Sequence, residues 1–193
     1  FRGIAAFMAA NGADAERFMA ALKAGTKAMA THTDDVVNHD AFWRTCFEVY
    51  GAEGEAERAQ LHELSGRYYR EAFPAIGDGF TPDAASARVV AALQEKGYPL
   101  VLTTMPMFPR TAVEHRLGWA GVDPGAFARI TTYENSKSVK PKQTYFAENL
   151  AALGLAGEDV LMVGNNTLED LAFCELGADA YLVTDWLFDP VGL

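Results

Sequence analysis

The sequence predicts an α/β protein in which an all-helical domain precedes a doubly wound, Rossmann-like parallel sheet. From about residue 14 to residue 73, apolar residues recur at three- and four-residue spacing, which is the pattern of amphipathic helices. Residues 74–83, PAIGDGFTPD, then gather Pro, Gly and Asp, which is typical of a linker. After this stretch, helical patterns and continuous apolar runs alternate four times, as a parallel sheet covered on both faces requires. We therefore expect a helical domain over residues 1–77 and an α/β core over residues 78–193.

The helices expected in the first domain follow from the spacing of their apolar residues. One helix contains Phe18 and Leu22, a second contains Phe42 and Cys46, and a third covers residues 54–73. The residues before Asp14 also have helical rather than signal-peptide character, because they lack a long hydrophobic region that ends in a small-residue cleavage site.

Several side chains in this part of the chain have expected structural roles. Asn38 or Asp40 can cap the second helix, and Gly51 is placed to end it. Aromatic residues at helical spacing are expected in the core of the domain rather than around a substrate: Trp43, Tyr68, Tyr69 and Phe73. The histidines lack metal-ligating spacing and are expected to be structural: His32, His39, His62 and His115.

In the expected α/β core, each helix is followed by a strand. Thr81 as N-cap and Pro82 as the first helical residue predict a helix that ends at Gly97. Continuous apolar runs predict strands at residues 99–104, 128–133, 159–164 and 179–185. The intervening amphipathic segments predict helices at residues 109–121, 141–154 and 167–177.

Composition excludes some classes of partner. Asp and Glu number 26 against 16 Lys and Arg, a formal charge of −10, and no basic run is present that could neutralise a series of phosphates, so nucleic acid is not an expected partner. No apolar run is long enough to span a membrane. Cys46 and Cys174 are far apart and lack metal or redox spacing, so we expect two reduced, buried thiols in a cytoplasmic protein. The sequence carries no signal for oligomeric state.

Polar residues follow the expected strands at their carboxyl ends, where ligands of such sheets bind. Thr104 follows the first strand, Lys140 lies after the second, and Asp170 comes shortly after the third. A Thr hydroxyl and the N–H of the next residue, Met105, can donate to phosphate oxygens, and a Lys ammonium opposes the anion. A carboxylate near Gly164 can hold Mg²⁺ through hard oxygen atoms.

This arrangement resembles the haloacid dehalogenase (HAD) superfamily, whose motifs stand in fixed order at strand ends. LVLTT, which ends at Thr104, is similar to the second motif, and Lys140-Pro141 followed by Tyr145-Phe146 is similar to the third. LMVGNNTLED, with Gly164 and Asp170, is similar to the fourth motif.

The resemblance implies a phosphohydrolase that acts on a small phosphorylated metabolite through an aspartyl-phosphate intermediate, with the helical domain as a cap. It assigns catalytic roles to Thr104, Lys140 and Asp170, and phosphate binding to Thr104, Met105 and Lys140. Mg²⁺ is the implied cofactor, and its expected ligands are Asn165 and Asp170.

The chain departs from the family pattern in three places. The first motif, a strand ending in Asp-x-Asp that supplies the nucleophile, is expected upstream of Phe1. In the family that strand lies in the centre of the sheet. Without it, we expect its two neighbouring apolar strands each to have an unpaired edge. Asn165 stands where Asp is usual, which removes a charge from the metal site, and Met105 stands where Asn is common.

Other interpretations stay open. Thr104 can simply end a strand, Lys137 and Lys142 are rivals of Lys140, and Asp170 can serve a helix N-terminus. Asn165 and Asn166 can be plain caps, and residues 133–136 a plain polar loop. The alternative function is a catalytically impaired relative kept for binding or structure. A Rossmann-type nucleotide binder or methyltransferase is disfavoured because no Gly-rich loop follows an early strand.

Overall fold

The computed structural model describes residues 1–192, and their packing divides them into two compact units. The first unit is Phe1–Asn135, and the second begins at Ser136. This division concerns packing alone, so the domain boundary expected between residues 77 and 78 stays a prediction. In the described part of the chain, no helix has both the length and the apolarity needed to cross a membrane.

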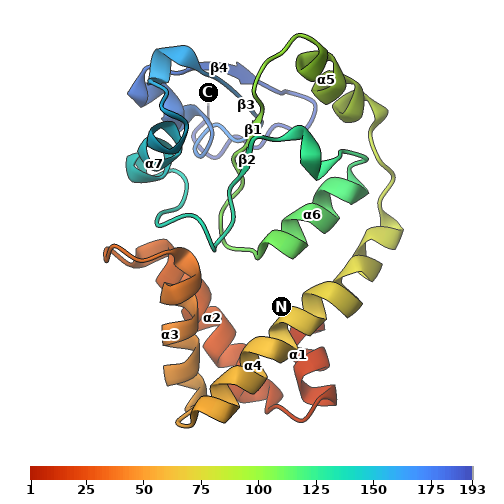
Figure 1. Cartoon of the computed structure of the whole chain (residues 1–193), viewed down its shortest axis with the longest axis vertical. Coiled ribbons are helices and arrows are strands. Elements are labelled where there is room, and N and C mark those ends of the chain that lie inside the picture. The colour runs from red at the N-terminus through yellow and green to blue at the C-terminus, as the bar shows by residue number, and fades with distance from the viewer. Residues whose placement is uncertain (193) are drawn as a thin grey trace. The chain divides into compact units, whose positions relative to one another are not determined.

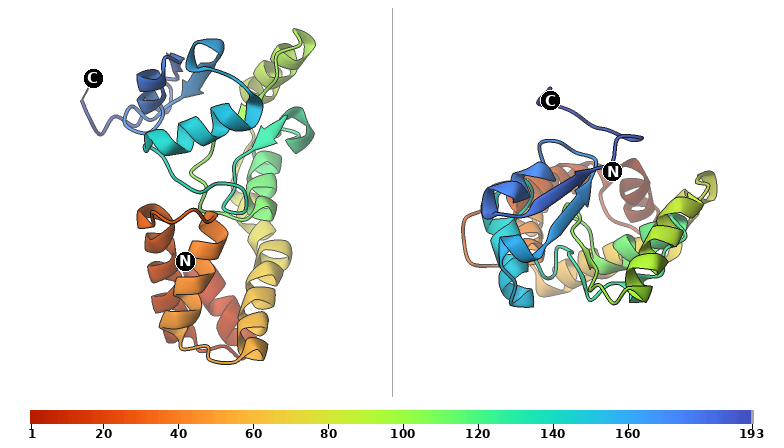
Figure 2. Two further views of the ribbon diagram at one scale, coloured as in Figure 1. Left: turned by 60° about the vertical axis from the view of Figure 1, so that its left-hand side comes forward. Right: turned by 90° about the horizontal axis from the view of Figure 1, so that it is seen from above.

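The first unit begins with four α-helices that lie side by side (Figures 1 and 2). They are α1 (Arg2–Ala10), α2 (Ala15–Thr31), α3 (Asn38–Tyr50) and α4 (Glu55–Arg67). The Asp14 side chain caps α2 by accepting from the N–H groups of Glu16 and Arg17. Gly51 ends α3 with φ 76°, as expected from a residue without Cβ. The apolar spacing thus placed the helices correctly.

Two details of this bundle differ from the expectation. Val37 occupies the N-cap position of α3, so the predicted caps Asn38 and Asp40 are wrong. The Asn38 amide is fully buried and instead bonds His32 Nε2 and the Pro106 carbonyl. The third helix is α-helical only to Arg67, and a π-helical turn η1 (Tyr68–Ala72) and a 3-10 helix η2 (Phe73–Gly79) continue it.

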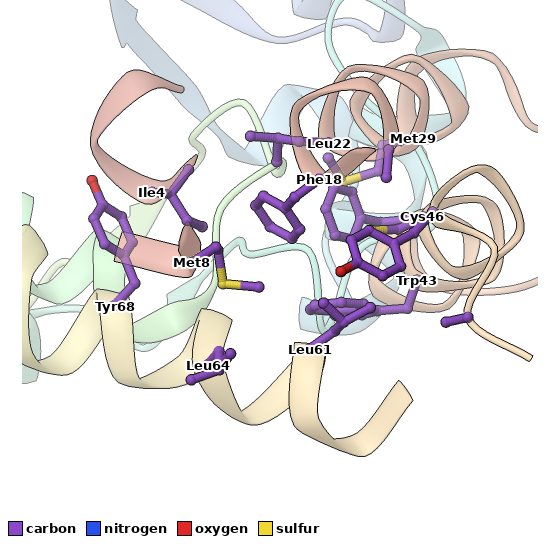
Figure 3. Packing of buried hydrophobic residues seen from close by; sticks show 14 of the residues in the cluster. Ile4, Met8, Phe18, Leu22, Met29, Trp43, Cys46, Leu61, Leu64 and Tyr68 are labelled. Atoms are coloured by element: carbon purple, nitrogen blue, oxygen red, sulfur yellow. The ribbon is translucent and has the colours of Figure 1, made fainter. Parts of the chain in front are cut away.

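The core of the helical part is apolar and aromatic (Figure 3). Met8 from α1, Phe18 and Met29 from α2, and Cys46 from α3 are almost fully buried. Tyr69 packs at the edge of this cluster. The expected packing of the aromatic residues in the core is confirmed, since the cluster also includes Trp43, Tyr68 and Phe73, although Trp43 and Tyr69 line a pocket as well.

The remaining elements of the first unit are two helices and a pair of short parallel strands. They are α5 (Ala84–Glu95), β1 (Val101–Leu102), α6 (Arg110–Trp119), the 3-10 helix η3 (Pro124–Ala126) and β2 (Arg129–Ile130). Val101 pairs with Arg129 and Leu102 with Ile130. The predicted cap Thr81 is wrong, because the Asp83 side chain caps α5 by accepting from the Ala85 N–H.

The second unit contains α7 (Gln143–Leu153), the 3-10 helix η4 (Gly157–Asp159), β3 (Leu161–Gly164), the 3-10 helix η5 (Leu171–Leu176) and β4 (Asp179–Leu182). β3 and β4 pair in parallel, from Leu161 with Asp179 to Gly164 with Leu182. The α-helix expected over residues 167–177 is instead a turn followed by the 3-10 helix. Side-chain bonds to the backbone of that turn compete with α-helical hydrogen bonds there. Cys174 is exposed, so its expected burial is wrong, whereas Cys46 is buried.

Among the described strands, β1 pairs only with β2 and β3 only with β4. Side chains of the second pair are partly uncovered: Leu161 is 60% exposed, Val163 54% and Tyr181 64%.

Candidate functional site

In the first unit, Thr104 lies two residues beyond β1, next to Thr131 beyond β2. The Thr104 N–H donates to Thr131 Oγ1 at 2.8 Å, and the Thr104 hydroxyl donates to the Thr131 carbonyl at 2.9 Å. Thr131 is fully buried, so it holds Thr104 at the carboxyl edge of this strand pair. Before this hydroxyl can donate to a phosphate oxygen, it has to leave the Thr131 carbonyl.

Met105 contributes a backbone group rather than its side chain. Its carbonyl accepts from the Met107 N–H at 2.8 Å. Within residues 1–192 the Met105 N–H donates no hydrogen bond, so it is available to an anion.

In the second unit, Lys140 and Asp170 form a buried ion pair. The Lys140 Nζ lies 2.6 Å from Asp170 Oδ1, with side-chain exposures of 6% and 9%. The rival candidates Lys137 and Lys142 are exposed. Because a buried ammonium needs a partner, Asp170 fixes Lys140 in position, and Lys140 is the lysine that fits the predicted role.

The second oxygen of Asp170 holds the turn after β3. Asp170 Oδ2 accepts from the N–H groups of Asn165 and Asn166, each at 3.0 Å. A Cβ on Gly164 would lie 2.2 Å from the same oxygen, so a residue without Cβ is needed there. Asp170 therefore both pairs with Lys140 and shapes the turn that carries Asn165.

The two asparagines of this turn have different roles. Asn166 Oδ1 accepts from the N–H groups of Leu168 and Glu169, so its capping interpretation fits the structure. The Asn165 Nδ2 donates to the Trp186 carbonyl. No described residue donates to Asn165 Oδ1, which leaves a neutral oxygen for a ligand.

Glu169 is a candidate that sequence reasoning missed. Burial raises the pKa of its carboxyl group, while Lys140 lowers it and Asp170 raises it, so all three groups are close enough to interact. Glu169 directly precedes Asp170 in the sequence, and this position could have indicated a second carboxylate at the site. The family's fourth motif matches Asp170 alone.

The donor set of this turn fits Mg²⁺, but weakly. Within residues 1–192 no group of three or more His, Cys, Asp and Glu side chains is arranged to hold a metal. Asp170 is engaged by Lys140 and two N–H groups, which leaves the Glu169 carboxylate and the Asn165 amide oxygen as further hard donors. Mg²⁺ is commonly held by one or two carboxylates together with water and substrate phosphate, so this set is sufficient in kind.

The predicted site residues thus occupy two groups. Lys140, Asn165 and Asp170 come together within the second unit, whereas Thr104 and Met105 lie in the first unit.

Comparison with known proteins places this chain among hydrolases. A family model described as haloacid dehalogenase-like hydrolase matches residues 2–175. No curated protein matches the chain.

Three solved structures are similar to it. The first is described as a predicted phosphoglycolate phosphatase from Haemophilus somnus 129PT, with 18% identity, 90% of this chain and 79% of that chain covered, and a TM-score of 0.49. The second is a HAD phosphatase from Thermococcus onnurineus, with 16% identity, coverages of 95% and 75%, and a TM-score of 0.49. The third is a beta-phosphoglucomutase from Clostridium difficile, with 15% identity, coverages of 92% and 77%, and a TM-score of 0.45.

Proposed function

Because the chain belongs to the haloacid dehalogenase-like hydrolases, we propose that it hydrolyses a small phosphorylated metabolite through an aspartyl-phosphate intermediate. The observation that carries this proposal is the buried pair of Lys140 and Asp170, with Nζ and Oδ1 2.6 Å apart, at the turn after β3. A cation that is held in place and largely removed from water interacts strongly with a phosphoryl group, because the surrounding dielectric is low.

Each proposed site residue has a defined task. Lys140 offsets the negative charge of the phosphoryl group, and Asp170 orients the Lys140 side chain. The Met105 N–H and the Thr104 hydroxyl donate to phosphoryl oxygens, the latter after it exchanges its bond to Thr131.

The nucleophile in this proposal is an aspartate on a strand upstream of Phe1. Its carboxylate oxygen forms a bond to phosphorus while the bond from phosphorus to the leaving oxygen breaks, and the leaving oxygen takes up a proton. Water then attacks phosphorus, which releases inorganic phosphate and restores the carboxylate. The open edge of β3 is compatible with an additional strand beside it, since among the described strands β3 pairs only with β4.

Mg²⁺ is the proposed cofactor, and Asn165, Glu169 and Asp170 would hold it. When bound, it neutralises charge that develops on the phosphoryl oxygens. Replacement of a carboxylate by the amide of Asn165 lowers the negative charge of this set by one, so we expect weak metal affinity.

The free thiols support a cytoplasmic location as part of this proposal. Cys46 is buried and Cys174 is exposed, and neither is in a disulfide. Such thiols persist in a reducing compartment.

The test is a phosphatase assay on the chain extended upstream along its reading frame, with a panel of small phosphate monoesters and varied Mg²⁺. We expect turnover that depends on Mg²⁺. Lys140→Met is expected to lower kcat/KM by at least about a hundredfold, because a positioned charge facing the transition state is lost. Lys142→Met, at an exposed position two residues away, is the matched control and should retain activity.

The alternative is a relative that binds phosphorylated compounds without turning them over, and Asn165 in place of an acid favours it. In that case the extended chain binds phosphate in a manner that depends on Lys140 and releases no product. An extended chain that neither binds nor hydrolyses phosphate esters would contradict both functions.

A further inference from the structure

We propose that a pocket in the first unit binds a carboxylate group on a short carbon chain. The pocket lies where α3, α4 and the turn η1 meet the start of α6 and the residues after β2. Its polar lining consists of Trp43, His62, Ser65, Arg70, Thr111 and Tyr133.

An unsatisfied donor in the wall of the pocket points to a ligand. Trp43 is only 4% exposed, and its indole N–H has no hydrogen-bond partner among residues 1–192. Indole N–H can only donate, so burial without an acceptor costs free energy that a ligand oxygen would recover. The Trp43 N–H lies near enough to the Tyr133 hydroxyl to lower the pKa of Tyr133 as a hydrogen-bond donor would, but the two groups are not joined by a hydrogen bond of normal geometry.

Hydroxyl groups around the pocket can also donate. Burial raises the pKa of the Tyr133 hydroxyl to about 12, and the nearby Trp43 N–H offsets this only in part, so Tyr133 keeps its proton. Ser65 and Thr111 add hydroxyl groups. Among the described residues that line the pocket there is no Asp or Glu, so an anionic ligand meets no negatively charged side chain in its walls.

Arg70 supplies one positive charge to this lining. Its Nη2 pairs with Glu63 Oε1 at 2.8 Å outside the pocket, which leaves further N–H donors of the guanidinium fork. A single, partly neutralised cation matches a monoanion better than a phosphate dianion.

His62 is held in a fixed orientation beside these donors. Its Nε2 lies 3.2 Å from His39 Nε2, and His39 Nδ1 lies 2.8 Å from Asp40 Oδ1. The Asp40 carboxylate accepts from His39 Nδ1–H, so a neutral His39 ring has an acceptor lone pair on Nε2. A neutral His62 ring then donates from Nε2–H to His39 Nε2. The chain from Asp40 through His39 therefore positions the His62 ring.

The size of the pocket limits the ligand. Its volume is about 60 Å³, and one water needs about 10–15 Å³ on this measure, so it accommodates roughly four non-hydrogen atoms. A carboxylate together with its adjacent carbon and one substituent matches this size. The aromatic walls from Trp43, Tyr69 and Tyr133 suit a planar group.

The pocket is built on the same strand ends as Thr104. Tyr133 comes two residues after Thr131, the hydrogen-bond partner of Thr104, and the Tyr133 N–H donates to the Phe108 carbonyl at 3.1 Å. The biological role of the pocket rests on the proposed function: the carboxylate would be the part of the phosphorylated substrate that does not react. Binding itself does not require turnover.

Gly66 offers a variant that closes the pocket. A Cβ at this position would lie 3.0 Å from Arg70 Nη1, so Gly66→Ala fills the lining and displaces the guanidinium. Gly66 lies inside α4, where Ala is a better helix former, so the variant is expected to fold. Gly118→Ala in α6 is the matched control, because a Cβ there meets nothing within 4 Å.

The test is a titration of the chain with acetate, with acetamide as its neutral isostere and inorganic phosphate as a second anion, followed by NMR at the Trp43 indole N–H. We expect a saturable shift with acetate that Gly66→Ala abolishes, Arg70→Gln weakens by about tenfold, and Gly118→Ala leaves unchanged. An equal response to acetamide, tighter binding of phosphate, or a shift that persists in Gly66→Ala would each overturn the proposal. Acetate binding without phosphatase activity in the extended chain would instead contradict only the proposed function.

Discussion

Asp170 is the side chain with the most tasks in the second unit. Its carboxylate neutralises Lys140, whose side chain is 6% exposed, and it accepts from the N–H groups of Asn165 and Asn166. We expect Asp170→Ala to lower the free energy of unfolding by about 3–5 kcal/mol, because it leaves a buried ammonium without a partner. Urea unfolding followed by circular dichroism measures this change.

Two further variants test the reason for this loss. The double variant Lys140→Met, Asp170→Asn is expected to regain part of the stability, since neither buried charge remains. Lys142→Met, at an exposed position, should stay within about 0.5 kcal/mol of the original chain. Equal stability of Asp170→Ala and the original chain would show that the ion pair is not formed in solution.

His62 makes stability depend on pH. Burial, and then the nearby His39, lower the pKa of His62 below its ordinary value of 6.5, while Glu63 has a smaller opposite effect. The folded state therefore prefers neutral His62, and this contribution to stability is complete above about pH 6.5 and is lost as the pH falls through the lower, folded-state pKa. We expect His62→Gln to reduce the drop in urea midpoint between pH 8 and pH 5 relative to the original chain. An equal drop in both chains would contradict this role of His62.

At the scale of elements, close contact between α2 and α3 depends on Gly25. A Cβ at this position would lie 2.7 Å from Cδ2 of Phe42 and 3.0 Å from the Phe42 carbonyl oxygen, which is backbone and cannot move freely. Gly25→Ala is expected to destabilise the chain by about 1–3 kcal/mol despite the better helix propensity of Ala. Gly118→Ala, exposed and without close neighbours, should stabilise by about 0.5–1 kcal/mol. Thermal unfolding of the two variants and of the original chain measures both changes.

Helix positions followed from apolar periodicity, whereas helix ends did not. The periodic residues Phe18, Leu22, Phe42 and Cys46 are all buried, as amphipathic helices require. The expected cap Asn38 was wrong because its amide bonds the carbonyl of Pro106, a residue 68 positions away. Local preference cannot foresee such a partner, since it becomes available only when the chain is folded.

At the scale of the whole molecule, four strands were predicted, and residues 1–192 contain four, in two parallel pairs. If an upstream strand pairs with β3, the amide groups that each of these two strands turns toward the other become protected from hydrogen exchange. We expect slower exchange over Leu161–Gly164 in the extended chain than in residues 1–193, because the N–H groups of β3 that face away from β4 gain acceptors. Asp179–Leu182 should change little, since β4 keeps the same partner. Identical exchange of β3 in both chains would contradict an added strand.

The candidate site was predictable only in part, because some of its contacts form only when the chain is folded. Motif order pointed to Lys140 and Asp170, and the structure joins them in a buried pair. The pair of His39 and His62 was not predictable, because 23 residues separate them and only the packing of α3 and α4 brings their Nε2 atoms to 3.2 Å. The carboxylate pocket was not foreseen either, since its wall combines helices with the ends of strands.

In the proposed function, this chain supplies the phosphate-binding part of a phosphohydrolase that uses an aspartyl nucleophile. The most direct test of this function is acid quenching of the extended chain during turnover of a phosphate monoester, followed by intact mass measurement. We expect a species heavier by one phosphoryl group on an upstream aspartate, strongly reduced in Lys140→Met and unchanged in Lys142→Met. Turnover without any such adduct, together with full activity after replacement of that aspartate, would contradict it.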